Sequence, residues 1–126
     1  MTNTTEPKVL RKRDHVFVKH LDELVADLLC DPRLSSAMLA THFCVCQRQF
    51  ARQVKRVLGM NTTQYIQRKR VERARRLLAD TELPITDIYV KCGFESANYF
   101  TRVFRKLTGD TPSDFRKKVW GDGMIK

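Results

Sequence analysis

Two short basic patterns in the chain carry the side chains best suited to binding a nucleic acid. Each pattern predicts a helix whose inner face is marked by a phenylalanine, Phe50 in the first and Phe100 in the second. At about 100° per residue, the side chains opposite these rings are Arg48, Arg52 and Lys55 in the first helix and Asn98, Arg102 and Arg105 in the second. An arginine fork matches the O6 and N7 acceptors of guanine, and an asparagine amide matches N6 and N7 of adenine. The two faces therefore predict contacts with DNA base edges, and Gln47 and Thr101 complete the set of candidate DNA-contacting residues.

An ordinary solvated helix surface carries similar residue types, so the overall charge of the chain helps to judge the two faces. The 126 residues include 24 Lys and Arg against 14 Asp and Glu, which gives a formal net charge of +10. A basic excess of this size favours nucleic acid as the partner, ahead of an anionic membrane surface or a solvated surface with no partner. Because both helices carry their polar faces at the same phase, the binding interpretation is favoured over the solvated one.

The two basic helices belong to a duplicated stretch of sequence. Residues 39–65 match residues 88–115, with one extra residue at the turn. Each copy predicts a short helix, a tight turn and a basic second helix, which is the pattern of a helix-turn-helix. Two such units favour a partner with a repeating anionic surface, and duplex DNA is the obvious candidate. The matched pairs include Leu39 with Ile88, Cys44 with Gly93, Phe50 with Phe100, Arg52 with Arg102, and Gly59 with Gly109.

Apolar periodicity places further helices around the two units. A first helix is expected after Asp14, its candidate N-cap, and should end at Asp31–Pro32. A long helix over about 62–79 joins the units, and a short helix follows Pro112. No segment alternates with a period of two, so the expected fold class is all-α, with seven helices and two helix-turn-helix subdomains bridged by a long central helix.

The same phase analysis separates inward from outward positions. In the second basic helix, Phe104 and Leu107 are expected to face inward with Phe100. The long helix is expected to expose its basic residues, Arg70 among them, opposite an inward face formed by Tyr65, Ile66, Val71, Ala74, Leu77 and Leu78.

Domain boundaries follow from the composition. Residues 1–13 are polar and then basic, which predicts a disordered arm or linker. The folded domain is expected over 14–118 and a C-terminal tail over 119–126. Within the domain, the helix-turn-helix units are expected at about 35–58 and 85–107.

Several classes of chemistry are disfavoured. The four cysteines contain no C-x-x-C pair, and Cys44 and Cys46 are too close for a usual zinc knuckle. The histidines have no metal spacing, and the acidic residues form no catalytic or metal-binding pattern. We expect no enzyme activity, catalytic residue, metal or cofactor. No apolar run approaches ~18 residues, and a reduced, cytoplasmic protein is expected.

The second copy also carries a long family signature. It reads Gly93-Phe94-Glu95-Ser96, then Asn98-Tyr99-Phe100, Arg102, Phe104-Arg105-Lys106, Gly109 and Thr111-Pro112-Ser113. Over roughly residues 14–118 the chain resembles the DNA-binding domain of the AraC/XylS family of bacterial transcription regulators. The resemblance implies a seven-helix fold and two recognition helices in successive major grooves of double-stranded DNA.

The resemblance also implies further partners. Family members commonly carry a sensing domain elsewhere in the chain, and the text of residues 14–21 resembles C-terminal domains of hybrid two-component sensors. We therefore expect a fragment of a longer parent chain with a sensor or receiver domain, and RNA polymerase as a partner.

Three positions depart from the family pattern. Cys46 stands where the family usually has a serine N-cap, and a lost cap costs ~0.5–2 kcal/mol. Tyr89 stands where a small residue normally lets two helices cross, which predicts a splayed or repacked second unit. The turn His42-Phe43-Cys44 replaces a turn of small residues that includes glycine.

Two functions remain open from the sequence. The first is a sequence-specific DNA-binding transcription regulator. The second is an architectural protein that coats or bends DNA with little sequence preference, since the same basic surface would serve it. The ratio of specific to random binding at fixed salt separates the two.

Overall fold

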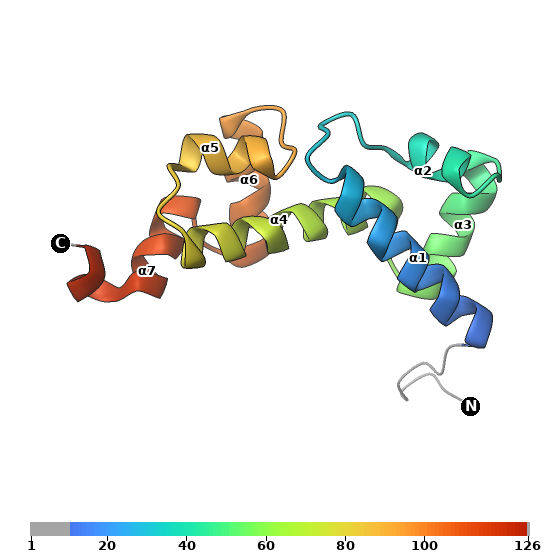
Figure 1. The fold of residues 1–126 in the computed structure, drawn as a ribbon, viewed down its shortest axis with the longest axis horizontal. Coiled ribbons are helices and arrows are strands. Elements are labelled where there is room, and N and C mark those ends of the chain that lie inside the picture. The colour runs from blue at the N-terminus through green and yellow to red at the C-terminus, as the bar shows by residue number, and fades with distance from the viewer. Residues whose placement is uncertain (1–10, 126) are drawn as a thin grey trace.

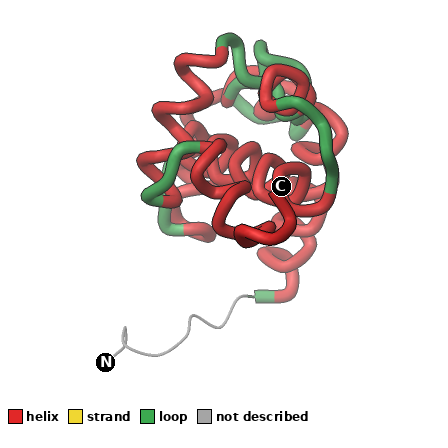
Figure 2. The backbone as a smooth tube through the Cα atoms, turned by 90° about the vertical axis from the view of Figure 1, so that its left-hand side faces the viewer, coloured by secondary structure: helices red, strands yellow, loops and turns green. Residues whose placement is uncertain are grey.

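The computed structural model describes residues 11–125, and these residues form seven α-helices (Figure 1). No strand occurs among them, as the backbone view in Figure 2 shows. The all-α, seven-helix prediction is therefore confirmed for the described part of the chain. The helices are α1 (Lys12–Leu28), α2 (Ser36–His42), α3 (Gln47–Leu58), α4 (Thr62–Asp80), α5 (Ile85–Lys91), α6 (Ala97–Thr108) and α7 (Pro112–Ile125).

Helix α4 belongs to two small cores, one at each of its ends. Its N-terminal half contributes Tyr65 and Ile66 to a cluster with apolar side chains of α1, α2 and α3. Its C-terminal half contributes Val71, Ala74 and Leu78 to a second cluster with α5, α6 and Phe115 of α7. Figure 1 shows one group of helices toward each end of the long helix. We call them the first and the second unit.

The duplication seen in the sequence is reproduced in the backbone hydrogen bonds of the two turns. The N–H of Val45 donates to the carbonyl oxygen of Ala40 at 3.2 Å, and the N–H of Phe94 donates to that of Tyr89 at 3.1 Å. Cys44 and Gly93 occupy matching positions in the duplicated sequence, and both lie in the left-handed region, with φ of 58° and 83°. The two units therefore share one turn geometry.

Tyr89 does not splay the second unit. Its ring is partly buried and lies parallel to Phe100, with ring centroids 6.4 Å apart at 25°. The larger ring thus packs on the second core, and the turn keeps the hydrogen bonds of the first copy. Of the two expected outcomes, local repacking is the one observed.

Cys46 retains part of the capping role that its sequence position calls for. Ser35, Asn61 and Ser96 cap α2, α4 and α6 with oxygen acceptors. At the start of α3, the thiol of Cys46 accepts from the backbone N–H of Gln49 at 3.4 Å. Because sulfur is a weak acceptor, this cap is weaker than a serine cap but is not lost.

The start of α1 differs from the prediction. Arg11 is the N-cap residue, and Asp14 lies inside the helix, almost completely buried. The carboxylate of Asp14 accepts from both terminal nitrogens of Arg56 on α3, at 3.0 and 3.3 Å. Lys12 and Arg13 of the expected arm belong to α1, while residues 1–10 lie outside the described residues.

Two further side chains were assigned to the wrong face. Arg70 was expected in solvent but is buried at 6% exposure. Leu107 was expected inward but is 38% exposed at the end of α6, where Val103 takes the buried position instead.

The C-terminal helix α7 continues into the expected tail, with a break at Gly121. The indole N–H of Trp120 donates to the carbonyl oxygen of Ala79.

Candidate nucleic-acid interface

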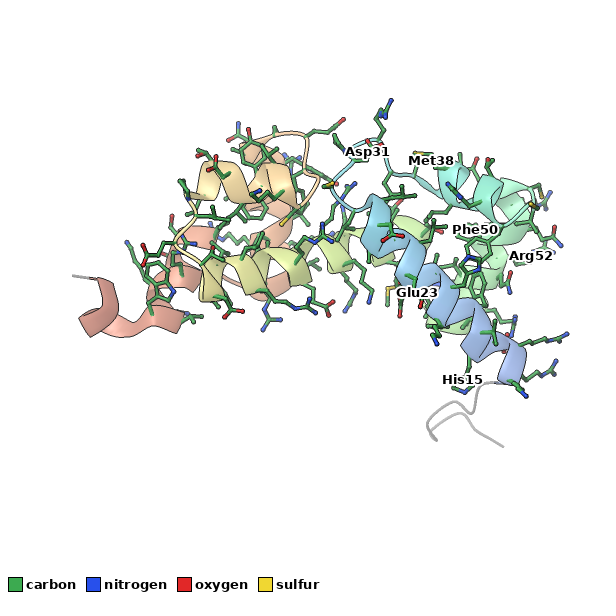
Figure 3. All side chains as sticks on the ribbon, in the orientation of Figure 1. His15, Glu23, Asp31, Met38, Phe50 and Arg52 are labelled. Carbon is green, nitrogen blue, oxygen red and sulfur yellow. The ribbon has the colours of Figure 1, made fainter. Side chains whose placement is uncertain are left out.

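The outward face of α3 presents a row of exposed polar side chains. Phe50, Val54 and Val57 are buried against the first core. Figure 3 shows Phe50 directed toward α1, with Arg52 on the outer side of α3. The residues predicted to contact DNA from this helix are all exposed; they are Gln47, Arg48, Arg52 and Lys55.

Helix α6 repeats this arrangement in the second unit. Phe100 and Phe104 are completely buried and Val103 nearly so. The predicted contact residues Asn98, Arg102 and Arg105 are exposed, and Thr101 is partly buried. Seven of the eight candidates are thus exposed on α3 or α6, and the role of each candidate in DNA binding stays a prediction.

Sequence reasoning missed a side chain that positions Arg102. The guanidinium of Arg102 lies over the ring of Tyr99, with 5.5 Å between the Arg102 Cζ and the ring centroid. The hydroxyl of Tyr99 in turn accepts from the side-chain amide of Gln67 on α4, at 2.8 Å. A stacked arginine has fewer free conformations to lose on binding. The signal available in the sequence was an aromatic residue one helical turn before the arginine.

The cationic side chains of both outward faces form no ion pairs with carboxylates of the described residues. Among the described residues, none of Arg48, Arg52, Lys55, Arg102 and Arg105 forms an ion pair within 4.0 Å. The ion pairs that do form lie elsewhere, as with Lys118 and Asp110 near α7. Unpaired guanidinium and ammonium groups remain available for guanine acceptors or phosphate oxygens.

Two glutamines extend the candidate interface beyond the predicted set. Gln49 and Gln53 lie on the flank of α3, where they line a shallow hollow of about 290 Å³ together with Arg52 and Arg56. Amide side chains of this kind can pair with adenine edges. The sequence did not indicate them because they lie between the inward and outward faces of α3.

Among the described side chains, no group of three or more His, Cys, Asp or Glu is placed to hold a metal ion. The four cysteines are free, and Cys92 packs in the second core, where burial raises its pKa to about 11. None of the described helices is long and apolar enough to cross a membrane.

The sequence of this chain is similar to a known protein family and to curated regulators. Residues 39–118 match a family model described as a helix-turn-helix domain. Over 99 residues the chain is 31% identical to the arabinose operon regulatory protein of Escherichia coli K12, covering 79% of this chain and 34% of that protein. It is 38% identical over 100 residues to the HTH-type transcriptional activator RhaR of the same strain, covering 76% and 35%. The chain thus spans about a third of the length of these relatives.

Solved structures show the same fold. The C-terminal domain of the two-component response regulator yesN from Fusobacterium nucleatum aligns with a TM-score of 0.74 at 28% identity, covering 79% of this chain and 98% of that one. The C-terminal domain of the response regulator AraT from Geobacillus stearothermophilus aligns with a TM-score of 0.76 at 27% identity, covering 80% and 84%. The DNA-binding domain of AdpA, solved with a target DNA, has the same fold at a TM-score of 0.77 and 22% identity, covering 82% and 92%.

Proposed function

The chain belongs to the AraC/XylS family of helix-turn-helix domains, and we propose that it is a sequence-specific DNA-binding module of a transcription regulator. Its proposed mode of action is to place α3 and α6 in successive major grooves on one side of the duplex. The observation that carries this proposal is the pair of matched outward faces, each presenting arginines that have no carboxylate partner among the described residues.

The chemistry of the two faces supports sequence reading as well as phosphate binding. Arg48 and Arg52 offer forks for guanine, and Asn98 offers an amide for adenine. Lys55 and Arg105 lie in the last turns of α3 and α6, where contacts with phosphates would fix the register of each helix in its groove.

Selection of bound DNA from a random pool tests the proposal directly. The expected result is enrichment of one asymmetric motif with two blocks separated by about one helical turn, ~10 to 10.5 bp. A variant with Arg48, Arg52, Asn98 and Arg102 all changed to alanine should lose the motif while keeping a stable fold. Tight binding by the unchanged protein without any enriched motif would contradict sequence-specific reading and leave the architectural function in its place.

The relatives support two further parts of the proposal. The matched segment is about a third of each curated relative, and two of the solved domains are C-terminal domains of response regulators. We infer that this domain receives its signal from a sensor or receiver domain of a parent chain and acts in the cytoplasm on RNA polymerase. Transcription in vitro from a promoter carrying the selected motif, with and without the protein, tests the contact with polymerase.

A further inference from the structure

The two units touch each other directly, at a point away from the axis of α4. Leu29 is the C-cap residue of α1 in the first unit, and Gly93 lies in the turn of the second unit. A Cβ atom on Gly93 would lie 2.0 Å from the carbonyl oxygen of Leu29 and 3.0 Å from Nε of Arg70. No side chain fits there, so glycine lets the end of α1 pack against the backbone of the turn. Figure 1 shows this end of α1 beside the loop between α5 and α6.

Two arginines of α4 donate hydrogen bonds to backbone carbonyl oxygens around the contact between Leu29 and Gly93. The buried Arg70 donates to the carbonyl oxygens of Leu29 and Asp31, at 3.3 and 2.7 Å. One turn later, Arg73 donates to the carbonyl oxygen of Ala26 at 3.1 Å and to that of Lys91 at 3.5 Å. The partial negative charge at a helix C-terminus favours a cation at such positions. Arg73 therefore connects the end of α1 in the first unit with the end of α5 in the second.

We propose that this junction of Leu29, Arg70, Arg73 and Gly93 fixes the angle between α3 and α6, and thereby sets the spacing between DNA blocks that the chain prefers. The inference rests on the proposed function. A single helix resists shortening, but each unit packs on only one half of α4 and could rotate about its axis. Because the junction lies beside that axis, it opposes such rotation. We assign these four residues a positioning role rather than a DNA contact.

The orientation of the units can be measured without DNA. Residual dipolar couplings of backbone amides in α3 and α6 should fit one alignment tensor in the unchanged protein. Gly93→Ala should require two tensors, since the added Cβ forces Leu29 away. Gly109→Ala is the matched control, because Gly109 also has positive φ, 90°, but a Cβ there meets nothing within 4 Å. A single unchanged tensor in Gly93→Ala would overturn the proposal, as would two tensors in the unchanged protein.

A second variant covers the case in which Gly93→Ala does not fold. Arg73→Met removes the donors to Ala26 and Lys91 and keeps the length of the side chain. Arg76→Met is its control, since Arg76 has the same charge on the same helix and its ion pair is with Glu72 at 4.0 Å. Two tensors are expected for Arg73→Met and one for Arg76→Met, and one tensor in both would overturn the proposal.

The consequence for DNA binding is measured with the selected motif and versions in which its blocks are moved by 1 or 2 bp. Arg73→Met should bind the preferred spacing about tenfold more weakly, the scale of one lost charge-assisted hydrogen bond, and should discriminate less between spacings. Affinity for a single block should change less than about twofold, because α3 and α6 themselves are intact. Unaltered spacing preference in Arg73→Met overturns the junction proposal alone. Absence of any two-block preference in the unchanged protein overturns the proposed function instead.

Discussion

At the scale of single residues, the arginines of this protein divide by what accepts their hydrogen bonds. Arg70, Arg73 and Arg116 donate to backbone carbonyl oxygens at the ends of helices. The single guanidinium of Arg116 donates to three carbonyl oxygens, those of residues 78, 81 and 83, at 3.0, 2.9 and 2.7 Å. Because these arginines are hydrogen-bonded within the fold, the net charge of the chain overstates the number of cationic side chains available to DNA. The arginines proposed to contact DNA are instead those on the exposed outward faces of α3 and α6.

The reading role of α3 predicts a loss of specificity. Arg48→Ala and Arg52→Ala should each reduce discrimination between the selected site and random DNA by ~1–3 kcal/mol, since one bidentate base contact is worth about that much. Titration of both DNAs at one salt concentration measures this difference. Arg76→Ala removes the same charge from α4 and controls for a general electrostatic effect. Equal weakening of both DNAs by the α3 variants would mean that they contact phosphates.

Asn98 allows a test in which no charge changes. Asn98→Ala should relax the preference for an A·T pair in the second block, because the amide that matches adenine is removed. The dependence of affinity on salt should stay nearly unchanged, whereas Arg105→Ala should lower the slope of log affinity against log salt by about one if it contacts phosphate. An Asn98→Ala protein with unaltered base preference would exclude the assigned role.

Backbone strain at Cys44 predicts a stabilising substitution. Cys44 is exposed and has φ of 58°, a region that costs a non-glycine residue roughly 1–2 kcal/mol. Cys44→Gly should raise the free energy of unfolding by up to about 1 kcal/mol, since glycine relieves the strain but adds entropy to the unfolded chain. Urea unfolding measures the difference. Cys44→Ala keeps the strain and should show no such gain.

At the scale of helices, the sequence was sufficient to predict which side chains are buried wherever apolar periodicity determines burial. Phe50 and Phe100 identify the inner faces of α3 and α6, and their burial is complete. Arg70 was misplaced because periodicity treats every arginine as a surface residue, whereas the carbonyl groups at the end of α1 create a site for one inside the fold. Leu107 was misplaced because its phase is inward, whereas its place in the last turn of α6 leaves it 38% exposed.

The misjudged role of Asp14 has the same origin, since its partner lies 42 positions away in the sequence. Periodicity describes one helix at a time and cannot show which helix lies opposite. Contacts between α1 and α3, or between Leu29 and Gly93, depend on the angles at which helices cross. For this reason the candidate reading residues were accessible from the sequence, while the residues that orient the two units were not.

The ion pair between α1 and α3 predicts a pH dependence of stability. Hydrogen bonds from Arg56 hold the pKa of Asp14 below its ordinary value, although burial of the carboxyl acts in the opposite direction. A carboxyl whose pKa is lowered by folding stabilises the fold at neutral pH, and this contribution is lost as pH falls through the lowered pKa. Thermal unfolding from pH 7 down to pH 3 should therefore show a decline that is shallower in Asp14→Asn.

The neutral variant should also unfold at a lower temperature than the unchanged protein at pH 7, because Arg56 loses an ionised partner. Glu23→Gln removes an exposed negative charge from the same helix and controls for the change in net charge. An Asp14→Asn protein with the same stability and the same pH profile as the unchanged protein would show that the pair makes no net contribution.

At the scale of the whole molecule, the length of α4 and the pitch of DNA can be compared. The 19 residues of α4 span about 28 Å at ~1.5 Å per residue. With a unit packed at each end, this length is of the order of the ~34 Å pitch of B-DNA. One chain then suffices to reach two successive major grooves on one side, so we expect a monomer bound to an asymmetric site. A misfit between the rigid protein and straight DNA would be met by bending the DNA, at ~1–6 kcal/mol.

This geometry makes affinity depend on the helical phase of the two blocks. Inserting 5 bp between them rotates one block to the far side of the duplex, since ~10 to 10.5 bp complete one turn. The affinity should then fall to that of a single block, because α4 and the contact between Leu29 and Gly93 do not allow the second unit to follow. Inserting about 10 bp restores the phase but moves the block a full pitch away, beyond the reach of α4, so affinity should stay low. Gel-shift titrations with the original site, both insertions and a single block measure these differences. If the 5 bp insertion left the affinity unaltered, only one recognition helix would be reading DNA, and the two-groove mechanism would be wrong.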